Sequence, residues 1–155
     1  MSNQQVIEVN SSSEDQTMTI GSNIGQTLTG QEVIELISDL GGGKTTFVKG
    51  LADGAGSQEL VSSPSFTLCN QYQAEQLTIY HFDFYRLNDP GIIRRELAEA
   101  LEVPKGVVVI EWPEVIEDIL PQKRLIIEFI SLTPSKRQLK LTLPETLSYL
   151  VKGLK

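Results

Sequence analysis

Apolar and polar residues repeat along this chain with two different periods, and these periods predict where strands and helices lie. Short, apolar, β-rich runs are separated by segments in which apolar residues recur at helical spacing. The expected strands are residues 4–10, 32–37, 65–72, 77–85, 106–112, 124–130 and 138–143. The first expected helix follows the serine- and acid-rich start at 11–16, and Met18, Ile24 and Leu28, with small Gly21 and Gly25 between, form its loose apolar face. The other expected helices span 44–55, 89–103, 114–120 and 144–155.

The order of these elements predicts the fold class. Strands alternate with helices in the first part of the chain, while residues 65–85 and 124–143 each read as a hairpin. The run at 106–112 is almost continuously apolar, which is typical of a central strand covered on both faces. We therefore expect an α/β fold with a central mixed sheet and helices on both faces.

Length and charge narrow the function classes. A chain of 155 residues is most simply one domain, so we expect residues 1–155 to form a single domain. The net charge of −7, from 20 acids against 13 lysines and arginines, disfavours a protein that grips nucleic acid by itself. The single cysteine fits a reducing compartment, and neither a membrane span nor a secretory signal is visible. We expect a cytoplasmic protein.

The stretch "ISDLGGGKTTFVKGL", residues 37–51, reads as a phosphate-binding loop between a strand and a helix. Glycines let the backbone N–H groups of residues 40–46 point at a phosphate, and the helix start adds its own N–H groups and dipole. Lys44 would reach the β- and γ-phosphates, and the Thr45 hydroxyl would bind Mg²⁺. The alternative is a glycine-rich turn that only caps the helix.

One residue departs from the loop pattern G-x-x-x-x-G-K-[ST]. Ser38 stands where that pattern has its first glycine. If the position requires a positive φ, serine costs roughly 1 kcal/mol or more. We expect weakened or altered phosphate binding rather than none.

Two acids follow apolar strand residues. Glu111 ends the run "VVVIE" and would emerge at the sheet edge, where phosphate-loop enzymes place an acid that holds Mg²⁺. Asp83 in "YHFDFYRL" is the second candidate, and alternation puts it on one face with His81. The alternative is that His81 and Asp83 hydrogen-bond to each other or to backbone. Arg86 either lies near phosphate or pairs with an acid.

The segment "SSPSFTL", residues 62–68, leads from the helix after the loop into a strand. A hydroxyl in such a segment can sense a γ-phosphate in nucleotide switches. A turn around Pro64 is the equal alternative.

Taken in order, four segments resemble the TsaE (YjeE) family, the ATPases of bacterial tRNA threonylcarbamoyladenosine biosynthesis. They are "DLGGGKTTFVKGL", "SSPSFTL", "YHFDFYRLNDP" and "VVVIEWPE", and the resemblance runs from about residue 14 to 143. It implies a P-loop NTPase-like three-layer domain that binds ATP and Mg²⁺ and hydrolyses ATP slowly alone. It also implies two partner proteins, which make the modified adenosine beside the anticodon, so that tRNA is met only indirectly.

The resemblance also implies roles for individual residues. Lys44, Asp83 and Glu111 are the expected catalytic residues, with Thr45 and Glu111 at the Mg²⁺ site and Asp83 as the switch acid. Trp112 belongs to the same signature. The expected nucleotide-binding residues are Glu14, Asp39, Leu40, Gly41, Gly42, Gly43, Lys44, Thr45, Thr46 and Arg137. Gly42 replaces the usual alanine of the family, and Ser38 replaces a glycine.

Three other functions compete with the ATPase. A GTPase needs the guanine-reading pattern N-K-x-D, which the chain does not contain. A small-molecule kinase needs an acceptor pocket and usually an arginine-rich lid, and no insertion of lid size exists. A nucleotide-binding interaction module with little or no turnover is the remaining alternative, suggested by Ser38.

Overall fold

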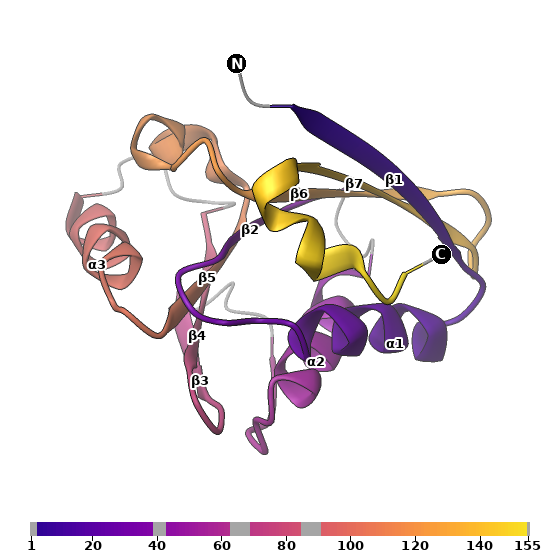
Figure 1. Cartoon of the computed structure of the whole chain (residues 1–155), viewed down its shortest axis with the longest axis horizontal. Helices are drawn as coiled ribbons and strands as arrows, with labels where there is room; N and C mark the ends of the chain where they lie inside the picture. Colours follow the sequence, from indigo (N-terminus) through magenta and orange to yellow (C-terminus); the bar gives the residue numbers. More distant parts are fainter. Residues whose placement is uncertain (1–2, 39–42, 63–68, 85–90, 155) are drawn as a thin grey trace.

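The computed structural model describes residues 3–38, 43–62, 69–84 and 91–154, apart from the side chains of residues 92 and 115 (Figure 1). Its sheet has seven strands in the order β1-β7-β6-β2-β5-β4-β3. The strands are β1 (Gln4–Ser11), β2 (Val33–Ile37), β3 (Cys69–Gln73), β4 (Thr78–Asp83), β5 (Gly106–Glu111), β6 (Leu125–Ser131) and β7 (Arg137–Pro144). The helices are α1 (Glu14–Gly25), α2 (Lys44–Gly54) and α3 (Gly91–Leu101), with 3₁₀ helices η1 (Pro113–Ile119) and η2 (Glu145–Val151).

The sheet is mixed, as the sequence predicts. Strands β6, β2, β5 and β4 run parallel, and antiparallel strands extend both sides: β7 and β1 beyond β6, and β3 beyond β4. Every residue of β5 is buried, because this strand has parallel neighbours on both sides and a covered surface on both faces. The carboxyl ends of the four parallel strands meet at one edge of the sheet.

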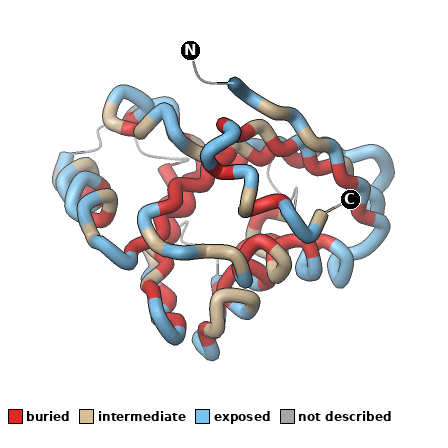
Figure 2. The backbone as a smooth tube through the Cα atoms, viewed as in Figure 1, coloured by how far each residue is buried: buried red, intermediate tan, exposed pale blue. Residues whose placement is uncertain are grey.

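Helices cover both faces of the sheet, which confirms the predicted three-layer arrangement. One apolar cluster joins alternate residues of the strands to α1, α2 and η2. The second cluster joins the other residues of β2, β4 and β5 to α3 and η1. Figure 2 shows buried residues along the central strands and many exposed residues in the connecting turns. None of the helices in the described part of the chain has the length and apolar character to cross a membrane.

Helices α1 and α2 lie side by side and touch through their backbones (Figure 1). Each has two glycines four residues apart in the contact, Gly21 and Gly25 on α1 and Gly50 and Gly54 on α2. A Cβ atom at Gly50 would lie 2.0 Å from the carbonyl oxygen of Met18, closer than any real contact. Glycine is therefore required here for close approach.

The first helix buries Gly21, Ile24 and Gly25 of its predicted face, but Met18 differs from the prediction. Its buried residues are Thr17, Ile20, Gly21, Ile24 and Gly25, whereas Met18 is 36% exposed. The glycine pair, rather than the longest apolar side chain, sets the face that meets α2. Ser13 caps the helix as the serine-rich start predicts, because its side chain accepts a hydrogen bond from the Gln16 N–H.

We expect Gly50→Ala to lower the free energy of unfolding by about 1–3 kcal/mol, because the added methyl group forces two helix backbones apart. Gly153→Ala is the matched control, since its Cβ would meet nothing nearer than Asn23 at 3.9 Å. Urea denaturation monitored by circular dichroism measures both. Equal stability of the two variants would contradict the close helix contact.

Candidate functional site

The candidate site lies at the carboxyl edge of the parallel strands. The register pairs Asp83 of β4 with Glu111 of β5, and Glu111 with Leu36 of β2. The chain then leaves β2 through the glycine loop and enters α2. Both predicted acids therefore lie at the edge where β2 ends and α2 begins, on the face of the sheet that α1 and α2 cover.

Gly43 precedes α2 in a left-handed conformation, with φ of 100° and ψ of 8°. A Cβ atom there would be 4.0 Å from its nearest neighbour, a ring atom of Phe129, so backbone conformation rather than space requires glycine. No side chain of the described residues caps this helix start. Its first N–H groups are thus directed at the space in front of the helix, where an anion is stabilised. Asp39, Leu40, Gly41 and Gly42 of the loop lie outside the described residues.

Lys44 is buried, with 6% of its surface exposed, and three described groups surround its ammonium. Its Nζ donates to the Ser38 carbonyl oxygen at 3.3 Å and lies 3.6 Å from Oε1 of Glu111. The same atom lies 4.6 Å from the centre of the Trp112 ring. A buried ammonium needs such partners because desolvation without them is costly. The predicted phosphate lysine and the predicted Mg²⁺ acid are therefore in contact.

Glu111 has a second partner that the sequence analysis did not assign. Its Oε2 lies 2.5 Å from Nε2 of His81, a side chain with no exposed surface. Alternation correctly places His81 and Asp83 on one face, but His81 contacts Glu111 rather than Asp83. Its one sequence signal is a histidine within an apolar strand pattern, and only the adjacency of β4 and β5 identifies its partner.

Trp112 follows Glu111 in a left-handed conformation, with φ of 56° and ψ of 62°. A non-glycine residue in this region costs about 1 kcal/mol or more, so the surrounding structure must hold it there. The turn directs the indole over Lys44.

The strain that the sequence analysis associated with Ser38 does not occur. Among the described residues other than glycine, positive φ is found at Gln31 and Trp112, and not at Ser38. Serine therefore fits this position without the conformational cost. Its carbonyl also contributes to the Lys44 environment.

Glu14 and Arg137 are brought to this same edge by different elements. Helices α1 and α2 run parallel, with Met18 level with Gly50, so the first residue of α1 lies level with Thr46 near the start of α2. Arg137 pairs with Ser11, two residues before the Ser13 cap of α1. The Arg137 guanidinium bonds to carbonyls of its own turn, including that of Thr133 at 3.0 Å. Glu14 is exposed and Thr45 is half-buried, so both are accessible.

The described residues fit a magnesium-bound nucleotide at this edge. The donors are of the right kind: a helix start that no described side chain caps, a buried ammonium, two carboxylates at adjacent strand ends, and a threonine, Thr45, that follows Lys44 in the chain. Mg²⁺ is usually held by one or two carboxylates together with phosphate oxygens and water. Within the described ranges, no three His, Cys, Asp or Glu side chains form a metal-binding group on their own.

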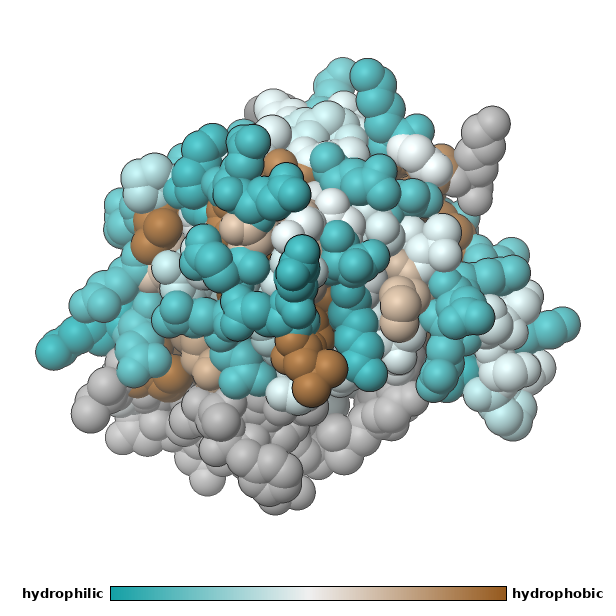
Figure 3. All heavy atoms as spheres, turned by 90° about the horizontal axis from the view of Figure 1, so that it is seen from below, coloured by the Kyte–Doolittle hydropathy of each residue, from teal (hydrophilic) through white to brown (hydrophobic). Residues whose placement is uncertain are grey.

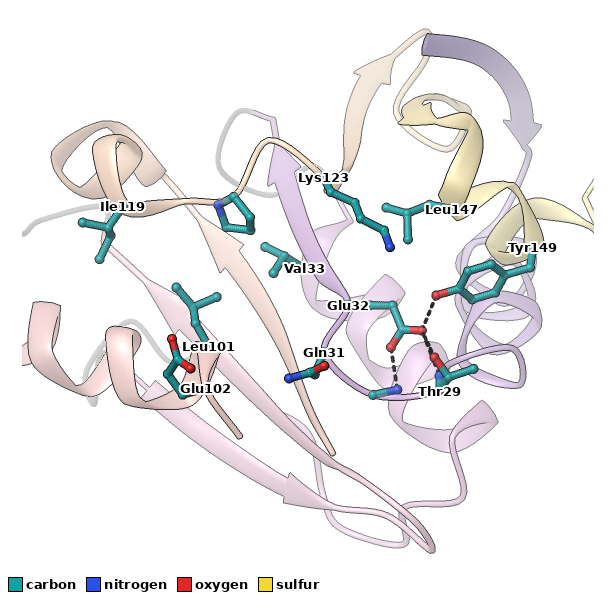
Figure 4. A pocket seen from close by; sticks show the side chains of 12 residues that line it. Thr29, Gln31, Glu32, Val33, Leu101, Glu102, Ile119, Lys123, Leu147 and Tyr149 are labelled. Carbon is teal, nitrogen blue, oxygen red and sulfur yellow. Dashed lines mark hydrogen bonds between the residues drawn. The ribbon is translucent and has the colours of Figure 1, made fainter. Parts of the chain in front are cut away.

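A cavity of about 530 Å³ lies at the opposite edge, beside the start of β2 (Figure 4). Here the buried Glu32 carboxylate accepts hydrogen bonds from the Thr29 hydroxyl at 2.7 Å, the Gly30 N–H at 2.7 Å and the Tyr149 hydroxyl at 2.6 Å. Burial, and then the bond to Glu32, raises the pKa of Tyr149 to about 12. These bonds tie η2 to the turn before β2, so we interpret them as structural.

Cys69 lies at the start of β3, where it pairs with Phe82, and it packs on the face of the sheet opposite Asp83 and Glu111. Burial, and then the nearby Glu96 charge, raises the pKa of the Cys69 thiol to about 12. The thiol stays protonated near neutral pH, which agrees with its interpretation as a small apolar residue.

The layered sheet, the strand–glycine–helix junction and the acid at the next strand end define the fold class of the phosphate-loop NTPases. Comparison with known proteins then identifies the family. Residues 11–139 match the family described as "Threonylcarbamoyl adenosine biosynthesis protein TsaE", and the chain belongs to this family.

Individual relatives agree with this assignment. The chain is similar to proteins named "tRNA threonylcarbamoyladenosine biosynthesis protein TsaE" from Nostoc sp. and Treponema pallidum. The Nostoc protein is 41% identical over 65% of this chain and 64% of its own length. The Treponema protein is 38% identical over 83% of this chain and 95% of its own length. The crystal structure of Bacillus subtilis YdiB superimposes with a TM-score of 0.82 at 29% identity, covering 99% of this chain and 97% of that one.

Proposed function

We propose that this protein is the ATP-binding, Mg²⁺-dependent ATPase component of the machinery that makes N6-threonylcarbamoyladenosine at position 37 of tRNA. The observation that carries the proposal is the buried Lys44 ammonium, held at the glycine-led start of α2 against Glu111. Its position matches that of a lysine that binds the β- and γ-phosphates. Family membership supplies the pathway.

The contacts suggest how the residues divide the work. Lys44 would leave Oε1 of Glu111 for the phosphates, and the first N–H groups of α2 would hold the same phosphates. Magnesium, bound with the nucleotide, would neutralise charge that develops on the phosphates during transfer. Thr45 and Glu111 would hold the metal, directly or through water, while Asp83 would orient water and respond to the γ-phosphate.

The protein's charge supports an indirect relation to tRNA. With a net charge of −7, it offers few cations to neutralise the phosphates of an RNA backbone. The face in Figure 3 is largely hydrophilic, and its apolar side chains form small separate groups. We propose that two partner proteins in the cytoplasm hold the tRNA, and that ATP hydrolysis here resets their complex between rounds. Segments 65–67 and 83–86 would transmit the change, although most of them lies outside the described residues.

The experiment measures nucleotide binding by calorimetry and phosphate release with and without the two partner proteins. We expect binding of ATP with Mg²⁺, much weaker binding of GTP, slow turnover alone and faster turnover with the partners. The isolated protein should not bind tRNA tightly at physiological salt. Equal affinity for ATP and GTP would overturn the ATP assignment, and ATP binding without turnover in either condition would favour the interaction module. Tight, salt-sensitive tRNA binding with no effect of the partners would favour an independent RNA-binding ATPase.

A further inference from the structure

His81 is the most completely buried polar side chain at the site, and its contact with Glu111 shows which ring nitrogen carries a proton. The ring has no exposed surface, and its Nε2 lies 2.5 Å from Oε2 of Glu111. A carboxylate oxygen accepts, so Nε2 donates. Of the two neutral tautomers of the ring, only the one with its proton on Nε2 can make this bond.

The remaining contacts of the ring hold it in that orientation. Tyr72 of β3 packs against it, with ring centres 6.3 Å apart and planes inclined by 47°. The other ring nitrogen, Nδ1, is buried and has no hydrogen-bond partner among the described residues. Among the described residues, the hydrogen bond to Glu111 is therefore the one polar contact of the imidazole. The hydrogen bond to Glu111 therefore distinguishes His81 from a residue that only fills the core.

The two carboxylate oxygens of Glu111 contact different residues, Lys44 and His81, which differ in their proposed roles. Oε1 lies 3.6 Å from the Lys44 ammonium, and in the proposed function this ammonium leaves Glu111 to bind the nucleotide phosphates. Oε2 is hydrogen-bonded to His81 on the neighbouring strand, and the proposed function gives His81 no contact with phosphate. When Lys44 moves to phosphate, the bond to His81 is the described contact that still fixes the carboxylate.

We infer that His81 is a positioning residue, which holds Glu111 in the orientation needed at the magnesium site while Lys44 exchanges its carboxylate partner for phosphate. This inference rests on the proposed function. Hydrogen bonds to a metal-binding carboxylate commonly change metal affinity or activity by about 10- to 100-fold. The bond from His81 is short, buried and made between adjacent strands, so its loss should reach that range.

The test compares His81→Leu, which removes the donor, with His81→Gln, whose side-chain amide can place an N–H near the position of Nε2. Phe82→Leu is the matched control, because Phe82 lies on the same strand, is equally buried and faces the other apolar cluster. Electron paramagnetic resonance measures Mn²⁺ affinity in the protein–ADP complex, and phosphate release measures turnover against Mg²⁺ concentration. Thermal unfolding checks that each variant is folded.

We expect His81→Leu to weaken Mn²⁺ binding and to raise the Mg²⁺ requirement by about 10-fold or more, with metal-free nucleotide binding unchanged. His81→Gln should recover most of the loss, and Phe82→Leu should change only stability. Metal affinity that is the same in His81→Leu and the unaltered protein would overturn the inference, as would a folded His81→Gln no better than His81→Leu. If the unaltered protein binds no magnesium nucleotide, the proposed function itself is refuted, and this inference with it.

A second measurement does not depend on the variants folding. His81 is the only histidine of the chain, so its ring gives one pair of ¹⁵N resonances. We expect the protonated nitrogen to be Nε2, with its shift altered by Glu111→Gln. A ring protonated on Nδ1 and not on Nε2 would overturn the inference, whatever the activity of the protein.

Discussion

Lys44→Ala is expected to weaken Mg-ATP binding roughly 100-fold or more, because hydrogen bonds to a charged group contribute about 1.5–3 kcal/mol each and this ammonium would make several to phosphate. The lysine already lies buried at the start of α2, so the nucleotide has only to replace its present partners. Isothermal titration calorimetry with a non-hydrolysable ATP analogue measures the effect.

Lys49→Ala is the control for this variant. Lys49 lies on the same helix but is exposed, so its loss should leave ATP affinity unchanged. Thermal unfolding should accompany both measurements, because Lys44→Ala also removes the cation beside Glu111. A folded Lys44→Ala protein that binds ATP as tightly as the unaltered protein would remove Lys44 from the site.

Glu111→Ala is expected to lower the rate of ATP hydrolysis about 100-fold while ATP affinity changes far less, since a positioned catalytic acid or base commonly contributes at least this much. The carboxylate acts through metal and water, whereas nucleotide affinity depends mainly on Lys44 and the helix start. Asp83→Ala should affect turnover in the same direction. Single-turnover phosphate release, measured at saturating ATP, separates the chemical step from binding.

Glu114→Ala is the matched control, because Glu114 is an exposed acid three residues beyond Glu111 in η1. Its loss should leave the rate unchanged. Hydrolysis at the normal rate by Glu111→Ala would exclude this acid from the reaction and would leave the contact with Lys44 as a structural ion pair.

Glu111 connects two elements of the candidate site. This carboxylate touches the lysine of the helix start through one oxygen and a histidine of the next strand through the other. The glycine contact between α1 and α2 adds a second connection, because it fixes the first residue of α1 level with the start of α2. If Lys44 moves toward phosphate as we propose, the movement would reach the rest of the fold through both connections.

The sequence by itself determined the features that depend on neighbouring residues. Strand and helix positions follow from apolar periodicity, and the glycine loop and the acid after "VVVI" follow from short motifs, because backbone preference and residue order are local properties. These features were enough to predict the layered α/β fold and the family. They also placed Lys44, Asp83 and Glu111 at one edge, since parallel strands end on the same side of a sheet.

Only the tertiary structure decided which of these residues touch. His81 and Glu111 are 30 residues apart, and their bond depends on β4 lying next to β5 in a register that no local pattern specifies. The exposure of Met18 beside the buried Gly21 depends on how closely α2 approaches, and Ser38 has a backbone conformation without positive φ that the motif alone does not specify. Such contacts arise from packing between segments that are distant in the chain, so local sequence patterns do not reveal them.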